Sequence, residues 1–366
     1  METVDDSVWV SLVPGPPQFE SRKMMSVYSK FLRELQTSRR RWLVSGAAGF
    51  IGTHLVETLL NLGQEVVGID NLSAGGKANL EAVLTRVSPD HKSKFEFYEM
   101  DISDIEKCRR HCEGIQYVLH QAALTSVPRS IKEPFLAHRC NVEGFLKLAL
   151  AAQESGVEAF VYASSASVYG QGQGSPLSEE APLMPASPYG TTKWIDEIYA
   201  QRLSQESPMR FFGLRYFNVI GPGQDATASY AAVVPRWIHA LVRNERTEIF
   251  GDGETTRDFC DVEDVVQANL LAAVTPTGCV EICNIGSGLG TRLVELHETI
   301  VRLLKEDGIV CPPNAPRFGP FRAGDVDRSV ADISKAIKIL GYAPEVSLEV
   351  SLKRVIRHAL GKGWPE

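Results

Sequence analysis

The sequence has no excess of basic residues and no hydrophobic run long enough to cross a bilayer. Its 366 residues include 38 Lys and Arg against 45 Asp and Glu, and the net charge of −7 gives no electrostatic reason to bind nucleic acid or anionic lipid. The apolar runs have the length of strands or are interrupted by charges, and the N-terminus lacks the basic-then-apolar order of a signal peptide. We therefore expect a cytoplasmic protein with no nucleic-acid or membrane partner.

Cysteine is sparse as well, and its spacing shows no pattern of metal ligands. The number of cysteines is odd, which fits reduced thiols in the cytosol. The seven cysteines are Cys108, Cys112, Cys140, Cys260, Cys279, Cys283 and Cys311. The eight histidines do not cluster either, and we interpret His120 as a structural residue of a strand. The sequence therefore predicts no metal site.

From Trp42 onward, short apolar runs alternate with amphipathic stretches of helical length. This alternation is typical of an α/β protein in which helices cover both faces of a doubly wound parallel sheet. The expected strands are residues 42–45, 65–69, 95–100, 117–121, 159–163 and 211–217. The expected helices are residues 51–62, 135–153 and 189–205.

The alternation weakens after Asn218, which indicates a second, smaller domain. Prolines and the lack of an apolar period predict that the first residues, up to about residue 24, are a mobile extension before a short helix over 28–35. We expect three parts: the N-terminal extension (1–40), a Rossmann domain that binds a dinucleotide (41–218 and 255–283), and a mixed α/β substrate domain (219–254 and 284–366).

The first expected strand runs directly into glycines at intervals of three, Gly46, Gly49 and Gly52. One glycine allows the tight turn, one lets the backbone approach a pyrophosphate, and one lets the helix pack close to the strand. Asp70 ends the second strand, where its carboxylate can accept hydrogen bonds from a ribose and repels the 2′-phosphate of NADP. The alternative is a structural turn and a strand-end cap, but strand, helix and acid together favour an NAD site.

A second motif is Pro-Tyr-Gly-Thr-Thr-Lys, in which Tyr189 and Lys193 are four residues apart. On a helix both side chains then project from one face and can reach the same small molecule. The ammonium favours the phenolate form, which turns a tyrosine into a base. Ser165 ends the fifth strand, at the edge where doubly wound sheets bind ligands. We expect these three residues to be catalytic, although a Tyr–Lys pair alone is common on solvated helix surfaces.

With these motifs, the stretch from Gly46 to about Leu340 resembles the extended short-chain dehydrogenase/reductase family, in its nucleotide-sugar epimerase branch and most closely in its UDP-N-acetylglucosamine 4-epimerase group. The resemblance implies the extended Rossmann fold, bound NAD, and a homodimer in which residues 135–153 and 189–205 form a four-helix bundle. The motifs that carry it are residues 121–123 (QAA), 164–170 (SSASVYG), 215–218 (RYFN), 251–259 (GDGETTRDF) and 322–326 (RAGDV).

The resemblance also implies which residues contact the cofactor, at the glycine loop, at the ends of the strands and on the helix of the Tyr–Lys pair. Without it, Asp101 is a turn residue and Ala122 and Ala123 belong to the core. The implied residues are Gly46, Gly49, Phe50, Ile51, Gly52, Asp70, Asn71, Asp101, Ile102, Gln121, Ala122, Ala123, Tyr189, Lys193 and Tyr216.

Enzymes of this branch first oxidise the sugar at C4, so the triad alone does not separate epimerases from dehydratases or decarboxylases. Related dehydratases carry an Asp-Glu pair directly after the catalytic hydroxyl residue, and decarboxylases commonly have a glutamate nearby. Ala166 and Ser167 occupy those positions and cannot exchange a proton in that way. The sequence therefore predicts 4-epimerisation, with NAD regenerated in each turnover.

The UDP-sugar contacts are likewise implied by the resemblance. Arg257 and Arg322 would grip the diphosphate and Asp325 the uridine ribose, although each of them alone is also compatible with a surface salt bridge. The full set is Ser126, Ser165, Asn218, Gln224, Ala232, Val233, Trp237, Arg257, Arg322, Asp325 and Ser329.

Ser329 determines which sugar we expect. In the related epimerases the residue four after the aspartate of the Gly-Asp motif lies beside the sugar C2 substituent, where a bulky side chain excludes an acetamido group. A serine leaves room, so UDP-GlcNAc and UDP-GalNAc are the expected substrates. UDP-glucose and an N-acetylated uronic acid are the alternatives. The uronic acid is included because Arg129 and Arg236 can meet its C6 carboxylate. Thr125, where a close relative has glycine, can reshape the pocket.

Two other glycine patterns do not predict nucleotide sites. Residues 286–290 lack a downstream acid at ribose spacing and are expected to form a loop that crosses between domains, and residues 73–77 lack the full phosphate-loop pattern. A different class of function is an NAD-binding sensor without activity, as arises when such folds lose their catalytic residues. The intact triad favours the enzyme.

Overall fold

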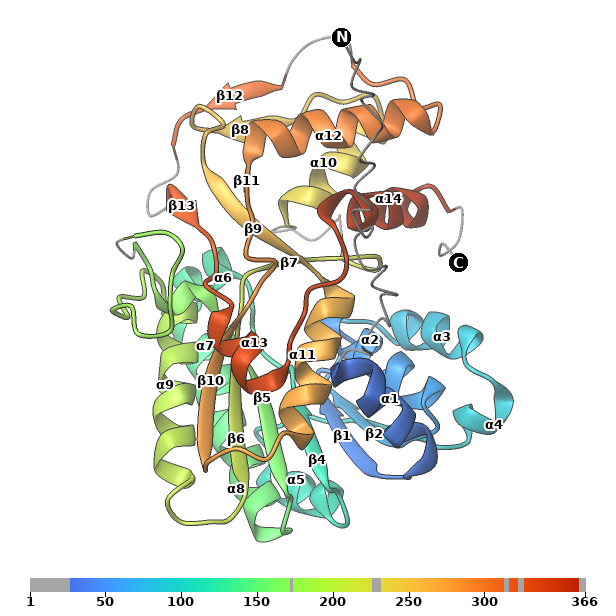
Figure 1. Ribbon diagram of the computed structural model, residues 1–366, viewed down its shortest axis with the longest axis vertical. Helices are drawn as coiled ribbons and strands as arrows, with labels where there is room; N and C mark the ends of the chain where they lie inside the picture. Colours follow the sequence, from blue (N-terminus) through green and yellow to red (C-terminus); the bar gives the residue numbers. More distant parts are fainter. Residues whose placement is uncertain (1–26, 172–173, 226–231, 313–315, 322–325, 362–366) are drawn as a thin grey trace, which may run out of the picture.

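The computed structural model describes residues 27–171, 174–225, 232–312, 316–321 and 326–361. A parallel sheet with helices on both faces forms the larger part, and a smaller body of short strands and helices lies beyond one end of that sheet (Figure 1). The first residues, for which the sequence predicts mobility, lie outside the described residues.

The larger sheet has seven strands in the order β10-β6-β5-β4-β1-β2-β3, and every neighbouring pair is parallel. The chain adds β2 and β3 on one side of β1 and then β4, β5, β6 and β10 on the other, which confirms the predicted doubly wound sheet. Such sheets bind ligands beside the carboxyl ends of the strands at this reversal. The strands are β1 (Arg41–Ser45), β2 (Glu65–Asp70), β3 (Phe95–Glu99), β4 (Tyr117–His120), β5 (Ala159–Ser165), β6 (Arg210–Tyr216) and β10 (Val280–Ile285).

Each of the six expected strands is present within two residues of its predicted bounds. The inner strands are short and mostly apolar because both of their faces are buried, as in β4, where all four residues are buried. The edge strand β3 has no buried residue. In a sequence, such apolar runs are distinguished from buried helices by their shorter length and by the glycines that flank them.

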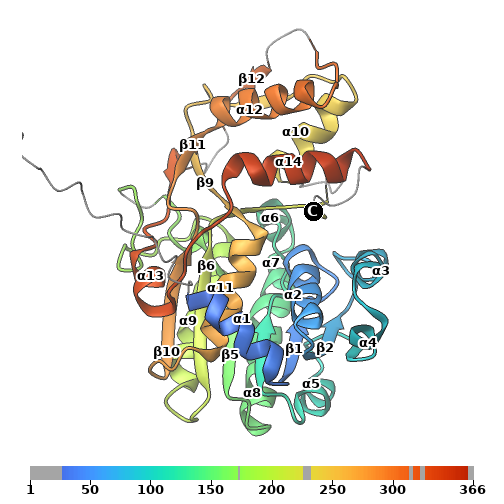
Figure 2. The ribbon, with the colours of Figure 1, turned by 45° about the vertical axis from the view of Figure 1, so that its right-hand side comes forward.

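The helices divide between the two faces of the sheet (Figures 1 and 2). One face is covered by α1 (Val27–Thr37), α2 (Phe50–Asn61), α11 (Val262–Val274) and α13 (Ser334–Leu340). The other is covered by α5 (Ile105–Cys112), α8 (Gly144–Glu154) and α9 (Pro188–Leu203). Helices α3 (Lys77–Arg86) and α4 (Pro89–Lys92) pack outside α2, and α6 (Val127–Lys132) packs on α9.

The prediction of one helix over residues 135–153 was wrong in detail. The segment consists of α7 (Pro134–His138), a π-helical turn η1 (Arg139–Glu143) and α8. The wider turn contains Asn141, whose side chain accepts the Leu124 N–H at 2.7 Å and donates to Thr192 Oγ1 at 2.9 Å. An apolar period cannot predict such a turn, because its cause is a polar contact with residues distant in sequence.

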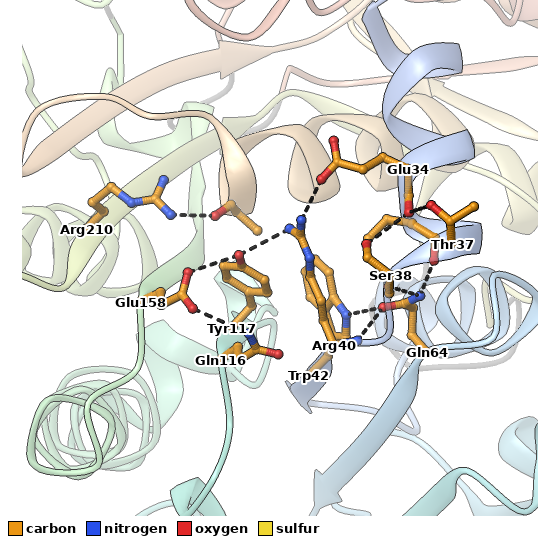
Figure 3. Close-up of polar contacts among 12 residues, drawn as sticks. Glu34, Thr37, Ser38, Arg40, Trp42, Gln64, Gln116, Tyr117, Glu158 and Arg210 are labelled. Atoms are coloured by element: carbon orange, nitrogen blue, oxygen red, sulfur yellow. Dashed lines mark hydrogen bonds and ion pairs between the residues drawn. The ribbon is translucent and has the colours of Figure 1, made fainter.

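The predicted short helix over 28–35 is present as α1, and it is fastened to the amino end of the sheet (Figure 3). Gln64 Nε2 donates to the Leu35 carbonyl at 2.6 Å, and Gln64 Oε1 accepts the Trp42 indole N–H at 3.3 Å. Phe31 and Leu35 are buried in the core beneath α11. This part of the N-terminal extension therefore packs as an additional helix of the larger body.

In the smaller body, β9 pairs with β7, β11 and β13, and β8 pairs with β12. Its core contains Trp237, Ile249, Ile300 and Leu352. The elements are β7 (Asn218–Ile220), α10 (Val233–Val242), β8 (Glu248–Phe250), β9 (Thr256–Asp261), β11 (Gly290–Arg292), α12 (Leu293–Glu306), β12 (Arg317–Gly319), β13 (Arg328–Ser329) and α14 (Leu348–Ala359). The division of the chain into a cofactor domain and a substrate domain stays a prediction.

None of the helices in the described ranges has both the length and the apolar composition needed to cross a membrane.

Candidate active site

The glycine loop between β1 and α2 has the close backbone approaches that glycine alone permits. Gly46 adopts φ +69°, and a Cβ there would lie 2.7 Å from the Ala122 nitrogen. A Cβ on Gly52 would lie 1.9 Å from the Gly46 carbonyl oxygen. Gly49 caps α2, and Phe50 and Ile51 are its first residues, so free amides of the helix terminus face the space beside the loop. This backbone cradle suits a pyrophosphate.

Asp70 lies at the carboxyl end of β2, as predicted, and its carboxylate shapes the loop. Its Oδ2 accepts the Ala48 N–H at 3.0 Å, and its Oδ1 accepts the Leu72 N–H at 2.8 Å. Both the ribose acceptor and the strand-end cap that the sequence suggested fit this position, because each carboxylate oxygen has a second lone pair.

The segment over residues 73–77, which lacks a full phosphate-loop pattern, packs on the dinucleotide loop. A Cβ on Gly75 would lie 2.2 Å from the Ala48 carbonyl oxygen. Asn79, in the first turn of α3, donates its side-chain N–H to the same carbonyl at 3.1 Å. The glycine at position 75 is therefore explained by contact with the first loop.

Next along the strand ends, Asn71 and Asp101 bond to each other, with the Asn71 amide donating to Asp101 Oδ2 at 3.1 Å. Burial alone would raise the pKa of Asp101, but hydrogen bonds from Ser103 and Asn71 outweigh it and hold that pKa below its ordinary value. Ile102 beside it is buried. A carboxylate kept ionised here suits hydrogen-bond donors of an adenosine.

The predicted cofactor residues of β4 and β6 are joined in one polar cluster. Tyr216 donates its hydroxyl hydrogen to Gln121 Oε1 at 3.2 Å and accepts from the Asn269 amide at 2.7 Å, while Gln121 Nε2 donates to Asn269 Oδ1 at 3.0 Å. Ala122, which precedes Ala123 in the turn after β4, donates its N–H to Ser45 Oγ at 3.3 Å. Asn269, on α11, fixes both side chains and was not predicted from the sequence.

The three expected catalytic residues come from two elements that pack together. Ser165 is the last residue of β5, is 9% exposed, and its Oγ accepts the Ser167 N–H at 3.1 Å, which leaves its hydroxyl hydrogen available. Tyr189 lies in the first turn of α9, and its backbone N–H is held by Ser130 Oγ at 3.1 Å. Helix α9 packs against β5 and against the short helical turn η2 (Ala166–Val168) that follows Ser165.

Lys193, one turn further along α9, is almost fully buried. Its Nζ donates to Asp196 Oδ2 at 3.3 Å, and the two side chains are 2% and 0% exposed. A buried ammonium requires such a partner or a ligand. The sequence motif gave the position of the lysine but not this carboxyl group.

Sequence reasoning also missed the polar residues that hold α9, the helix of the Tyr–Lys pair. Arg215 makes a bidentate pair with Glu197, both at 2.8 Å, and Glu197 Oε1 also accepts the Ser164 hydroxyl at 2.6 Å. On the other side, Asn141 binds Thr192 in the middle of the Tyr–Lys motif. The available signal was the charge of Arg215 after the apolar residues of β6, because a charged residue buried among them needs a partner.

The predicted substrate residues in the described ranges lie on or next to α6, β7, α10 and the paired strands β9 and β13. Ser126 caps α6 and accepts the Arg129 N–H at 3.2 Å, and the exposed Asn218 begins β7. Gln224 Nε2 donates to the Val219 carbonyl at 3.2 Å, and its Oε1 is buried without a hydrogen-bond partner in the described part of the chain. Ala232 and Val233 are at the start of α10, with Ala232 exposed.

Trp237 lies inside the core of the smaller body and is 2% exposed. Its indole N–H donates to the Glu248 carbonyl at 3.1 Å, and its ring lies edge-on to His297 at 5.5 Å between centroids. The structure therefore assigns it core packing, and a substrate contact stays a prediction.

Arg257 and Ser329 are brought side by side as register partners of β9 and β13. Arg257 Nη1 donates to the carbonyls of Thr256 and Val326. These contacts fix the guanidinium beside Val326. Arg322 and Asp325 lie outside the described residues.

The glycine pattern over residues 286–290 is held by a buried carboxylate. Asp258 accepts the backbone N–H groups of Ser287, Gly288 and Ala331 at 2.7, 3.0 and 3.1 Å. This loop leads from β10 of the large sheet to β11 of the smaller body, as the sequence predicted. Throughout the described ranges, no group of three His, Cys, Asp or Glu side chains is arranged to hold a metal ion.

Comparison with known proteins identifies the family of the chain. The model of the NAD dependent epimerase/dehydratase family matches residues 42–286. The chain is 39% identical over 318 residues to the UDP-glucose 4-epimerase of Mycolicibacterium smegmatis, a match that covers 86% of this chain and 97% of that protein.

Solved structures show the same relationship. A UDP-N-acetylglucosamine 4-epimerase from Methanobrevibacter ruminantium, in complex with UDP-N-acetylmuramic acid, is 31% identical with a TM-score of 0.81, over 89% of this chain and 100% of that one. A UDP-glucose 4-epimerase from Thermus thermophilus in complex with NAD is 32% identical with a TM-score of 0.76, over 88% and 99%. The glycine cradle, the sheet order and these matches together show that the chain belongs to the NAD dependent epimerase/dehydratase family, with NAD as its cofactor.

Proposed function

We propose that this chain is a UDP-sugar 4-epimerase that interconverts UDP-GlcNAc and UDP-GalNAc. The observation that supports this most directly is the position of Ser165 at the carboxyl end of β5, beside the helix that carries Tyr189 and Lys193. The two residues after Ser165 are Ala166 and Ser167, where a dehydratase needs an acid and a base.

Each residue of the triad has a distinct task in this proposal. Tyr189, as phenolate, accepts the proton of the C4 hydroxyl and later returns it. Lys193 favours that phenolate through its charge and holds the nicotinamide ribose. Ser165 donates its free hydroxyl hydrogen to the reacting sugar oxygen. Bound NAD supplies the acceptance and return of one hydride at C4, and the 4-keto sugar must turn over between the two transfers.

The cofactor and substrate residues predicted from the sequence keep their proposed roles. The cradle around Gly46 and Gly52 would hold the pyrophosphate, and Asp70 the adenosine ribose. Arg257 would bind the diphosphate of the substrate. Ser329, as its register partner, would face the C2 substituent, where a serine leaves room for an acetamido group.

A second candidate is a preference for UDP-glucose, which the 39% identity to the Mycolicibacterium smegmatis enzyme favours. The third, an N-acetylated uronic acid, would use Arg129 or Arg236 for its C6 carboxylate. These candidates share the C4 chemistry and differ only in the sugar pocket.

We also propose a homodimer built on α7, η1, α8 and α9. Apolar side chains stand exposed along this surface, with Phe135 90% exposed, Ile198 48% and Trp194 37%. Such a row on neighbouring helices is typical of an interface between subunits.

The experiment is proton NMR of the purified enzyme with UDP-GlcNAc, UDP-glucose and UDP-N-acetylglucosaminuronate in parallel. We expect the H4 signal of the galacto product to grow fastest for UDP-GlcNAc, with no added NAD consumed. Faster turnover of UDP-glucose or of UDP-N-acetylglucosaminuronate would contradict UDP-GlcNAc as the preferred substrate. A 4-keto-6-deoxy product, or NADH formed in stoichiometric amount, would contradict epimerisation.

A further inference from the structure

Tyr189, Lys193 and Asp196 follow one another at positions i, i+4 and i+7 of α9. At 3.6 residues per turn, these positions lie on one stripe of the helix. The ammonium proposed to act on the tyrosine therefore has a carboxyl group behind it, 3.3 Å from Nζ and with no exposed side-chain surface. Lys193 lies between a proton-transferring residue and a buried acid.

The acid is only partly satisfied by hydrogen bonds. Asp196 Oδ1 is buried without a hydrogen-bond partner in the described part of the molecule. A buried carboxylate with an unpaired oxygen is costly, which favours the protonated form. Burial raises the pKa of Asp196 to about 7, against the charge and hydrogen bond of Lys193, and the charge of Glu197 adds to the rise. This group therefore changes its charge near neutral pH.

His120 and Tyr162 face this pair from neighbouring strands and do not change charge there. On β4, burial and then the charge of Lys193 lower the pKa of His120 to about 3, so the ring is neutral. On β5, burial raises the pKa of Tyr162 far above its ordinary value. Glu197 of α9 also faces the pair, and both of its carboxylate oxygens accept hydrogen bonds from Arg215 of β6.

We propose that Asp196 is a positioning residue that sets the charge around Lys193. When ionised, it holds Nζ from the protein side and offsets part of the positive field at Tyr189. When neutral, it leaves the full field of the ammonium to favour the tyrosinate. The inference rests on the proposed roles of Tyr189 and Lys193 in C4 chemistry.

The size of the effect follows from the helix. Seven residues rise about 10 Å along the axis. At that distance and an effective dielectric constant of about 20, one charge changes an ionisation equilibrium by about one pH unit.

The test is the pH profile of kcat/KM for Asp196→Asn, which removes the charge and keeps an acceptor oxygen at nearly unchanged volume. We expect the acid limb of the profile to lie lower than in the wild type, by up to about one pH unit where Asp196 is fully ionised, and to be steeper because one titration is gone. An unmoved limb would overturn the proposal. A uniform fall in rate at every pH, with the limb unmoved, would show a purely structural role and would overturn it as well.

A matched control is Asp264→Asn on α11. Asp264 is another buried carboxyl, 2% exposed, and burial raises its pKa to about 7 too, but its helix covers the opposite face of the sheet from α9. Its variant should leave the acid limb in place, and an equal displacement of the limb in both variants would overturn the proposal in favour of a general charge effect. Asp196→Ser, smaller and uncharged, gives the same comparison should the asparagine variant fold poorly.

Tyr189→Phe separates this inference from the function on which it rests. Retained epimerase activity in that variant would refute the tyrosine chemistry itself. An inactive Tyr189→Phe together with an unmoved limb in Asp196→Asn would refute only the role of Asp196.

Discussion

Substituting Gly75 with alanine should weaken NAD binding although the residue lies 29 positions after Gly46 in the sequence. Its added Cβ would lie 2.2 Å from the Ala48 carbonyl oxygen and 2.9 Å from the Gly49 nitrogen, whereas real Cβ atoms essentially never come closer than 3.0 Å. The loop must therefore move by about 0.8 Å relative to the start of α3. Ala48 is tied to Asp70 on its other side at 3.0 Å, so the loop cannot yield freely.

The expected magnitude follows from the hydrogen bonds that such a movement would misalign. Two amide–phosphate hydrogen bonds to a charged group are worth roughly 1.5 kcal/mol each, and their loss would raise the Kd for NAD about 100-fold. The assay is calorimetric titration of NAD into the cofactor-free enzyme, with the NAD content of the purified protein as a second reading.

Gly76 provides a matched control one residue away. A Cβ there meets nothing closer than 4.0 Å, and its φ of −126° suits any residue. Gly76→Ala should therefore bind NAD within about threefold of the wild type, well below the tenfold change that corresponds to about 1.4 kcal/mol. Equal Kd values for Gly75→Ala and the wild type would refute the packing argument.

Three further predictions concern other residues. Ser329→Tyr should lower kcat/KM for UDP-GlcNAc by about 100-fold while sparing UDP-glucose, and equal losses for both sugars would contradict the proposed role at C2. Asp264→Asn should gain stability relative to the wild type as pH rises from about 4 to 7. The pKa of the Asp264 carboxyl is higher in the folded protein than in the unfolded chain, so its ionisation destabilises the wild-type fold over this range. Each whole unit by which the two pKa values differ contributes about 1.4 kcal/mol. Chemical denaturation at pH 5 and pH 8 measures this gain, and a pH-independent difference would count against it. Phe135→Glu should produce monomers in light scattering if α7 belongs to a dimer interface; an unchanged mass would exclude that surface.

The parts of the fold that could be predicted from the sequence are those with local causes. The inner strands of the large sheet are mostly apolar runs because both of their faces are buried, and the glycines at 46, 49 and 52 follow one strand directly. Asp70 could be located because it ends the next strand. In each case the pattern and its cause lie close together in the sequence.

The features that escaped prediction depend on contacts between distant segments. The π-helical turn around Asn141 is explained by Leu124 and Thr192, and the pair of Gln121 with Tyr216 is completed by Asn269 from α11. An apolar period or a motif does not encode these partners.

Motifs also carry no direct record of helix phase or burial. Asp196 stands seven residues after Tyr189, so its place on the same stripe could have been predicted from the spacing, but a motif that ends at Lys193 draws no attention to it. Trp237 is the opposite case, because the resemblance suggests a substrate contact while its side chain fills the core of the smaller body.

The most direct measurement of the central claim uses a UDP-sugar that carries deuterium at C4. Transient oxidation by bound NAD predicts that the epimerised product keeps the full deuterium label at C4, on the opposite face, because the same hydride returns after the keto sugar has turned. Mass spectrometry with proton NMR in ordinary water reads both the label and the configuration. Loss of the deuterium to solvent in the epimerised product would contradict hydride transfer at C4.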